Sequence, residues 1–207
     1  MTGRLLPYGD RAWLLDGLSD PAAVADRLRA WAWPRDRVPE TVVGAATCLL
    51  RFHGPPAAES EVAAAVGAAT SPSAPPTGAA ARTVLLPVRY DGEDLIAVAR
   101  ASGCSVAAVI AMHTGTAFRV AFLGFAPGFA YLEGLPEQLH LPRRTVPRVR
   151  VPAGSVAIAD RYTAVYPRVS PGGWHLLGRT EVQLFDPGRT EPSTLRPGMI
   201  VRFEAIP

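Results

Sequence analysis

Residues 167–180, PRVSPGGWHLLGRT, crowd two prolines, three glycines, one tryptophan and two arginines around a short apolar core. Gly172 and Gly173 can take positive φ angles or let another group approach the backbone, and Pro171 fixes the entry to the segment. A tight turn leading into a strand needs the same residue types. On these residues alone, a binding site and a structural turn both remain possible.

A second stretch, FLGFAPGFAYL (122–132), carries the aromatic residues Phe125, Phe129 and Tyr131. Three residues prevent it from being one regular strand, namely Gly124, Pro127 and Gly128. Aromatic rings on an irregular backbone can form a shallow apolar floor for a ligand. The alternative is that these rings belong to the hydrophobic core.

A third stretch, PRRTVPRVRVPAGS (142–155), spaces Arg143, Arg144, Arg148 and Arg150 among prolines that hold the backbone extended. Guanidinium groups on a stiff scaffold suit recognition of carboxylate or phosphate, although a solvated basic strand would have the same composition. No GxSxG or SxxK motif activates a serine. Ser155 and Ser170 are therefore interpreted as turn residues that could still hydrogen-bond a ligand, and no catalytic residue is identified.

The composition excludes several mechanisms. All 21 basic residues are arginine, and without lysine the chain can hold neither a Walker A loop nor a Schiff base nor attached biotin. The four histidines are scattered without metal-ligand spacing, so no metal site is expected. The two cysteines, Cys48 and Cys104, are too few for a disulfide framework and are interpreted as core residues in a reducing compartment.

Charge is concentrated in one part of the chain. Residues 143–202 carry 10 arginines against 4 acidic residues, whereas residues 1–142 carry 11 against 13. The resulting positive face could meet nucleic acid, an acidic small molecule or an acidic protein. Within the helical pair expected over 92–115, the segment CSVAAVIAMHT (104–114) offers only Ser105, His113 and Thr114 for base contacts, so nucleic-acid binding is not expected.

The elements that must position these residues divide into two groups. Residues 19–33 predict a helix with Asp20 as its N-cap and Pro21 at its first position, residues 41–52 a buried strand, and residues 57–70 a second helix. These make residues 1–70 a small α+β domain. Residues 71–82 are rich in proline and predict a linker.

Beyond the linker, residues 83–90 predict a strand and residues 92–115 two short helices separated by Gly103. From residue 117 onward short apolar runs alternate with glycine and proline, which predicts an all-β barrel or sandwich within the domain 83–207. No run approaches the ~20 apolar residues of a membrane span, and the N-terminal residues lack an apolar signal region. A cytoplasmic protein without membrane contact is expected.

Taken together, the motifs resemble a known family. PVRYDGEDL, HTG, GFAPGFAYL, VPAGSVAIA, SPGGWHLLGRT and RPGMIVRF occur in the order seen in the B subunit of bacterial ATP-dependent 5-oxoprolinase. The same family includes Kip-type inhibitors of a sporulation histidine kinase and proteins called allophanate hydrolase subunit 1, and it is similar to half of the carboxyltransferase region of urea carboxylase. The resemblance runs from YGDRA (8–12) to the C-terminal end.

This resemblance implies an α+β fold in which a small N-terminal domain precedes a cyclophilin-like β-barrel. It implies a carboxyltransferase-like partner subunit, a possible third subunit, and ATP consumed by the assembled complex as 5-oxoproline is opened to glutamate. The chain alone is expected to be inactive. Residues 167–180 would then edge a cleft shared with the partner. Backbone N–H groups of Gly172 and Gly173 and the charge of Arg179 would meet an anion there, above a packed Trp174.

Two alternatives follow from the same resemblance: a module that inhibits a sensor histidine kinase, and a subunit acting on allophanate or a related urea derivative. The residues around Arg161 depart from the family pattern, because Asp160 and Tyr162 stand where a glycine and a glutamine are common. This departure leaves the substrate open.

Overall fold

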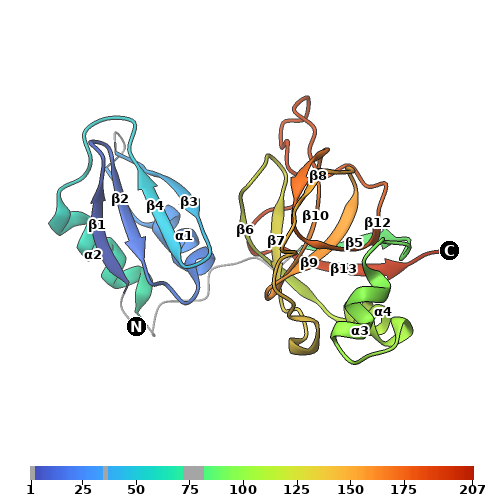
Figure 1. Cartoon of the computed structure of the whole chain (residues 1–207). Helices are drawn as coiled ribbons and strands as arrows, with labels where there is room; N and C mark the ends of the chain where they lie inside the picture. Colours follow the sequence, from blue (N-terminus) through green and yellow to red (C-terminus); the bar gives the residue numbers. More distant parts are fainter. Residues whose placement is uncertain (1–2, 35–36, 72–81) are drawn as a thin grey trace. The chain divides into compact units, whose positions relative to one another are not determined.

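The computed structural model describes residues 3–34, 37–71 and 82–207. Contacts within the chain define two compact units, Met1–Ala80 and Ala81–Pro207. Apart from residues 71 and 82, the predicted linker lies outside the described residues. Each unit is therefore described by itself (Figure 1).

The first unit is a four-stranded antiparallel sheet with two helices. Its strands are β1 (Arg4–Tyr8), β2 (Ala12–Asp16), β3 (Glu40–Val43) and β4 (Thr47–Arg51), in the order β1-β2-β4-β3. Helices α1 (Pro21–Ala30) and α2 (Glu59–Thr70) pack on each other, and α1 packs on β3 and β4. The predicted start of α1 is confirmed, since the Asp20 side chain accepts a hydrogen bond from the Ala23 N–H at 3.1 Å.

The prediction of one strand over residues 41–52 is wrong. Residues 44–46 turn the chain, and β3 and β4 pair as a hairpin whose turn is closed by a 2.8 Å hydrogen bond from Gly44 N to the Thr47 carbonyl. The apolar run hid this turn because its two alanines resemble strand interior. Gly44 was the local signal.

The second unit is built on a seven-stranded sheet in the order β12-β9-β10-β7-β6-β13-β5. These strands are β5 (Thr83–Val88), β6 (Phe118–Leu123), β7 (Ala130–Glu133), β9 (Ser155–Ala159), β10 (Tyr162–Val165), β12 (His175–Arg179) and β13 (Ile200–Ala205). A separate ribbon pairs β8 (Arg148–Val151) with β11 (Ser170–Gly172). Helices α3 (Leu95–Ala101) and α4 (Val106–Gly115) and a short 3-10 turn (Glu137–Leu139) complete the unit.

The two outer strands of this sheet meet. Directly after β5, Arg89 forms an antiparallel bridge with Arg179 at the end of β12, through two backbone hydrogen bonds of 2.9 Å each. A side chain at Gly178 would collide with the Arg89 carbonyl, so this glycine permits the close approach. The bridge leaves a nearly closed barrel, and the predicted α+β fold with a barrel in its second half is confirmed.

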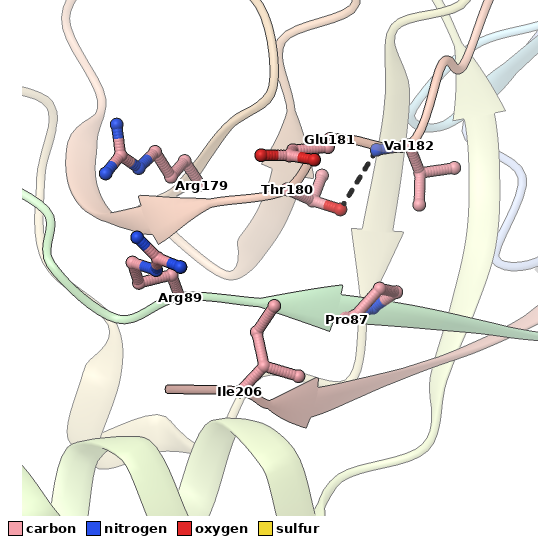
Figure 2. Close-up of a pocket in the computed structure, with 7 residues that line it drawn as sticks. All are labelled: Pro87, Arg89, Arg179, Thr180, Glu181, Val182 and Ile206. Carbon is pink, nitrogen blue, oxygen red and sulfur yellow. Dashed lines mark hydrogen bonds between the residues drawn. The ribbon is translucent and has the colours of Figure 1, made fainter.

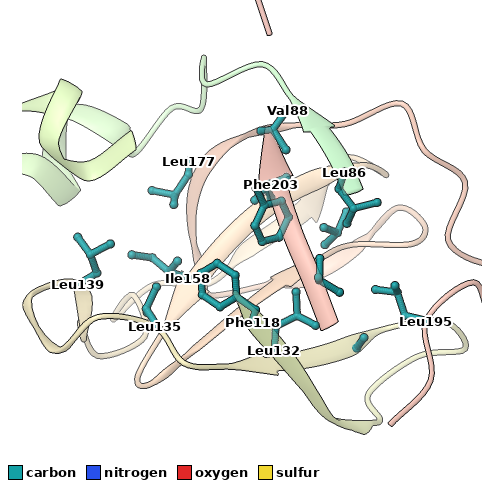
Figure 3. Close-up of a cluster of buried hydrophobic side chains, with 14 of the residues drawn as sticks. Leu86, Val88, Phe118, Leu132, Leu135, Leu139, Ile158, Leu177, Leu195 and Phe203 are labelled. Atoms are coloured by element: carbon teal, nitrogen blue, oxygen red, sulfur yellow. The ribbon is translucent and has the colours of Figure 1, made fainter. Parts of the chain in front are cut away.

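The barrel interior is filled by aliphatic and aromatic side chains from all sides of the sheet (Figure 3). Leu86, Phe118, Leu132, Ile158 and Leu177 are fully buried there. Strand β9 is buried along its whole length. Its Val156 and Ile158 belong to this core, and its alanines pack in a second cluster that contains several aromatic rings.

One histidine lies inside the core. His113 of α4 is fully buried, and its Nδ1 and Nε2 lie 2.7 Å from Tyr90 Oη and 2.9 Å from Thr163 Oγ1. Since the Thr163 hydroxyl donates to the Ala157 carbonyl, it accepts from Nε2–H, and Nδ1 accepts from Tyr90. Burial lowers the pKa of His113 to about 3. His113 therefore stays neutral and joins α4 to the sheet.

The described part of the chain has neither a metal-ligating cluster nor a single helix that could span a membrane. Within residues 3–34, 37–71 and 82–207, no group of three His, Cys, Asp or Glu side chains could hold a metal ion. No single helix there is long and apolar enough to cross a membrane, although α3 and α4, bent by 94°, reach that length and composition as a pair.

Candidate functional site

Seven aromatic rings gather on the outer side of the barrel, next to the ribbon of β8 and β11. Neighbouring ring centroids lie between 4.3 and 6.4 Å apart, mostly in edge-to-face geometry. The cluster consists of Phe122, Phe125, Phe129, Tyr131, Tyr162, Tyr166 and Trp174. Phe129, Tyr166 and Trp174 are buried, so much of the cluster is a packed core.

Phe125 is the exception within this cluster. Its ring is 60% exposed, and its backbone has φ of 64°, a region that non-glycine residues rarely occupy. The loop around it is tight: Gly128 has φ of +79°, and a Cβ there would lie 2.6 Å from Phe185 Cβ. A strained backbone that presents an exposed aromatic ring is typical of a residue retained for contact with another molecule.

Gly172 has a packing role. A side chain at this position would collide with the Tyr166 hydroxyl, so the glycine makes room for a buried ring. Gly172 faces Arg148 across the ribbon, and the Gly173 carbonyl accepts a 2.7 Å hydrogen bond from Arg144 N. The expected binding of an anion by the two glycine N–H groups stays a prediction.

Arg144 and Arg148 surround a buried carboxylate. Asp94, only 4% exposed, accepts hydrogen bonds from Arg144 Nη1 at 2.7 Å, Arg148 Nη2 at 2.9 Å and the Leu176 backbone N–H at 2.8 Å. Arg148 also donates to Glu93. Burial of Asp94 acts to raise its pKa, but these hydrogen bonds and the arginine charges outweigh it and leave the pKa below its usual value.

The consequence is that Arg148 is already paired with two acids inside the chain. Arg148 fastens the start of β8 to the residues just before α3, and Asp94 in turn accepts from Leu176 of β12. Sequence reasoning did not single out Asp94, although GEDL at the start of the predicted helical pair was a signal for a structural acid.

Arg143 faces the aromatic cluster from its exposed side. Its guanidinium lies 3.9 Å from Asp160 and is 61% exposed. Burial raises the pKa of Tyr131, and the nearby positive charge of Arg143 partly opposes this rise. We call Phe125, Tyr131, Tyr162 and Arg143 the aromatic–arginine surface. It can hold a flat, partly apolar group beside a cation.

The residues around Arg161 border this surface. Asp160 takes a left-handed backbone with φ of 51°, a conformation that a glycine adopts without strain. Arg161 stacks 5.1 Å above the Tyr162 ring and donates to its hydroxyl at 2.8 Å. The left-handed backbone of Asp160 and the Arg161 side chain stacked on Tyr162 therefore form the edge of the aromatic–arginine surface.

Arg179 lies elsewhere. Trp174 precedes β12 and Arg179 is its last residue. These two residues of the predicted cleft therefore lie at opposite ends of the strand. Arg179 lines a hollow of about 490 Å³, which we call the seam pocket because it lies where the barrel closes (Figure 2). Its lining consists of Pro87, Arg89, Arg179, Thr180, Glu181, Val182 and Ile206.

The remaining predicted residues, Ser155, Ser170 and Pro127, lie in the sheet, in the ribbon and in the Phe125 loop. Ser155 is buried opposite Arg179 in the sheet, Ser170 faces Val151 in the ribbon, and Pro127 lies in the loop that presents Phe125. The structure thus brings the aromatic residues and Arg143 together and separates them from Arg179. Sequence reasoning missed Arg89, which directly follows β5, a strand far from β12 in the chain.

The barrel, the aromatic cluster and the order of these motifs define the class of the protein. The chain belongs to the family of the carboxyltransferase domain, subdomain C and D, whose model matches residues 4–195. It is 53% identical over 125 residues to the 5-oxoprolinase B subunit of Escherichia coli O157:H7, covering 59% of this chain and 57% of that protein. It is 46% identical over 128 residues to the 5-oxoprolinase B subunit of Bacillus subtilis (strain 168), covering 60% and 53%. The aligned region is thus somewhat more than half the length of these relatives.

Solved structures extend the comparison. TTHA0988 superimposes with a TM-score of 0.78 at 38% identity, over 95% of this chain and 40% of that chain. The conserved uncharacterized protein PH0987 from Pyrococcus horikoshii gives 0.58 at 34% identity, over 98% and 97%. Urea carboxylase from Kluyveromyces lactis gives 0.70 at 18% identity, over 98% and 22%, which shows a shared fold.

Proposed function

We propose that this chain is the B subunit of a 5-oxoprolinase, in which 5-oxoproline is opened to glutamate. The observation that carries the proposal is the 53% identity over 125 residues to a protein named as a B subunit of 5-oxoprolinase. At that identity, this chain can have the same binding surfaces as the relative. Function depends on such surfaces more than on the fold.

The proposal includes partners and a nucleotide. The complex would contain a carboxyltransferase-like subunit, with a third subunit as a further component, and would act in the cytoplasm. Because the chain has no lysine and no phosphate-binding loop, we assign ATP binding to another subunit. The chain alone is then expected to be inactive.

Within this complex, we assign the aromatic–arginine surface to the contact with the partner and the cleft it shares. An exposed phenylalanine on a strained backbone supports this assignment, because aromatic residues provide much of the binding energy in protein interfaces. Arg143 beside it adds an exposed cation, whose ion pair with the equally exposed Asp160 is long at 3.9 Å.

The test is reconstitution of the complex with a Phe125→Gly variant. Glycine relieves the left-handed backbone and removes the exposed ring, so the melting temperature of the chain should change by less than roughly 5 °C. Affinity for the carboxyltransferase-like subunit should fall at least about tenfold, as expected for truncating an interface aromatic residue. ATP-dependent release of glutamate should fall with it.

Ile96→Ala is the matched control, because Ile96 is an equally exposed apolar residue, at 61%, on helix α3. It should leave assembly and activity unchanged. If wild-type chain captured from its host brings down a histidine kinase and no carboxyltransferase-like subunit, the proposal is wrong and the chain is a regulator. Cleavage of allophanate but not 5-oxoproline by the assembled complex would overturn the substrate assignment.

A further inference from the structure

The seam pocket contains two arginines directly opposite each other. Arg89 and Arg179 form a hydrogen-bonded antiparallel pair, and side chains in such a pair leave the sheet on the same side. Figure 2 shows both arginine side chains at the same end of the pocket, above and below the end of β12 in this view. Like charges in this arrangement destabilise a sheet, so the pairing calls for a compensating anion.

Among the described residues, an acidic side chain pairs with only one of these two arginines. Arg179 Nη2 lies 2.9 Å from Asp91 Oδ2. Arg89 Nε donates to the main-chain oxygen of Pro207, the last residue of the sequence, at 2.8 Å, and this is the only hydrogen bond of its guanidinium within the described residues. No side-chain carboxylate in the described ranges forms an ion pair with Arg89. The Nη1 and Nη2 groups of Arg89 therefore remain available to a ligand.

The rest of the lining restricts what that ligand can be. Pro87, Val182 and Ile206 offer apolar surface, and Glu181 adds a negative charge among them. A multiply charged anion such as a phosphate would meet repulsion from Glu181 and gain nothing from the apolar residues. A small carboxylic acid with a hydrocarbon body and an N–H group satisfies all of them. The volume of about 490 Å³ lies in the usual range for small-molecule sites.

We propose that the seam pocket is a binding site for a small organic carboxylate, held between Arg89 and Arg179, with its hydrocarbon part on Pro87, Val182 and Ile206 and its N–H group toward Glu181. A carboxylate can accept two parallel hydrogen bonds from one guanidinium, which matches the free edge of Arg89. Bound there, the ligand also screens the charge repulsion across the bridge that closes the barrel. 5-Oxoproline belongs to this chemical class, and its choice as the probe rests on the proposed function.

The site is tested by calorimetric titration of the purified full chain with 5-oxo-L-proline. The matched control ligand is 2-pyrrolidinone, which has the same ring and N–H group but no carboxylate. Binding of 5-oxo-L-proline should weaken as salt rises, and 2-pyrrolidinone should bind at least about tenfold more weakly. Arg89→Gln and Arg179→Gln should each raise the Kd for 5-oxo-L-proline at least about tenfold.

Two further variants keep the result interpretable. Arg89→Lys retains charge but loses the planar fork, so its Kd should lie between those of wild type and Arg89→Gln. Arg100→Gln removes an exposed arginine from the end of α3 and should leave the Kd unchanged. Melting curves without ligand establish that each variant is folded. If Arg89→Gln does not fold, Arg179→Gln is compared with wild type in its place, and the reverse holds if Arg179→Gln does not fold.

Failure of this inference and failure of the proposed function give different results. If the wild type binds no 5-oxo-L-proline at tens of millimolar, or if Arg89→Gln and Arg179→Gln bind it as tightly as wild type, the site is refuted even when the assembled complex is active. If binding depends on both arginines but the complex opens no 5-oxoproline, the site stands and the proposed function is wrong.

Discussion

Replacing Asp94 by asparagine should destabilise the barrel unit strongly, although the two side chains have nearly the same shape. The change removes the charge that Arg144 Nη1 and Arg148 Nη2 approach at 2.7 and 2.9 Å. Breaking a buried ion pair by removing one partner costs about 3 to 5 kcal/mol. Arg148 keeps Glu93 and the Arg144 side chain is 34% exposed, so we expect about 2 to 4 kcal/mol, or roughly 10 °C in melting temperature.

Calorimetric melting at pH 7 measures this loss, and Asp91→Asn is the matched control. Asp91 pairs with Arg179, but the two side chains are 41% and 61% exposed, so its loss should cost less than about 1 kcal/mol. A fall of less than about 3 °C for Asp94→Asn would show that the arginines are solvated well enough without this carboxylate, and the reasoning would fail.

The pH dependence provides a second check on the same carboxylate. Its pKa is lower in the folded chain than the ordinary value of 3.8, so its stabilisation is complete above that value and disappears as the pH falls below it. The melting temperatures of wild type and Asp94→Asn should therefore converge below about pH 4. A constant difference down to pH 2 would contradict an ionic origin of the effect.

Two further predictions concern the packed parts of the barrel unit. His113 has a pKa of about 3 when folded and about 6.5 when unfolded, so the wild type should lose stability steadily as the pH falls through this interval. A His113→Phe variant should be less stable at pH 7 but show a flatter profile between pH 6 and 4 in thermal melts. Gly172→Ala should cost about 1 to 3 kcal/mol because its Cβ collides with the buried Tyr166, whereas Gly115→Ala, with open space around it, serves as the control. Equal melting temperatures for these two alanine variants would refute the packing role of Gly172.

Local signals in the sequence predicted the elements well. Asp20 followed by Pro21 marks the start of α1, and Gly103 separates α3 from α4, because capping and helix interruption depend on neighbouring residues. The barrel was also predicted, since the rhythm of short apolar runs reports strand length and turn spacing. The hairpin within residues 41–52 was missed where an apolar turn lacked its usual polar residues.

The candidate site was predicted less completely, because its contacts join distant parts of the chain. Arg148 was correctly identified as part of an arginine-rich segment, but its partner Asp94 lies 54 positions earlier. Arg179 was identified as a charge near a cleft, but its cross-strand neighbour is Arg89 at the other edge of the sheet. Pairings of this kind are set by how the barrel closes, and no local pattern encodes them.

Whether each charge or strained residue is compensated within the chain separates structural from functional roles. His113, Asp94 and Gly172 all look unusual in the sequence or in their burial, yet hydrogen bonds, arginines and a tyrosine ring account for each of them. Phe125 and Arg89 differ, since one has a strained backbone under an exposed ring and the other a guanidinium edge without a partner among the described residues. A fold under selection for stability alone would remove such features, because most of them cost free energy and a single substitution relieves each one. We therefore propose the aromatic–arginine surface and the seam pocket as the places where this chain binds other molecules.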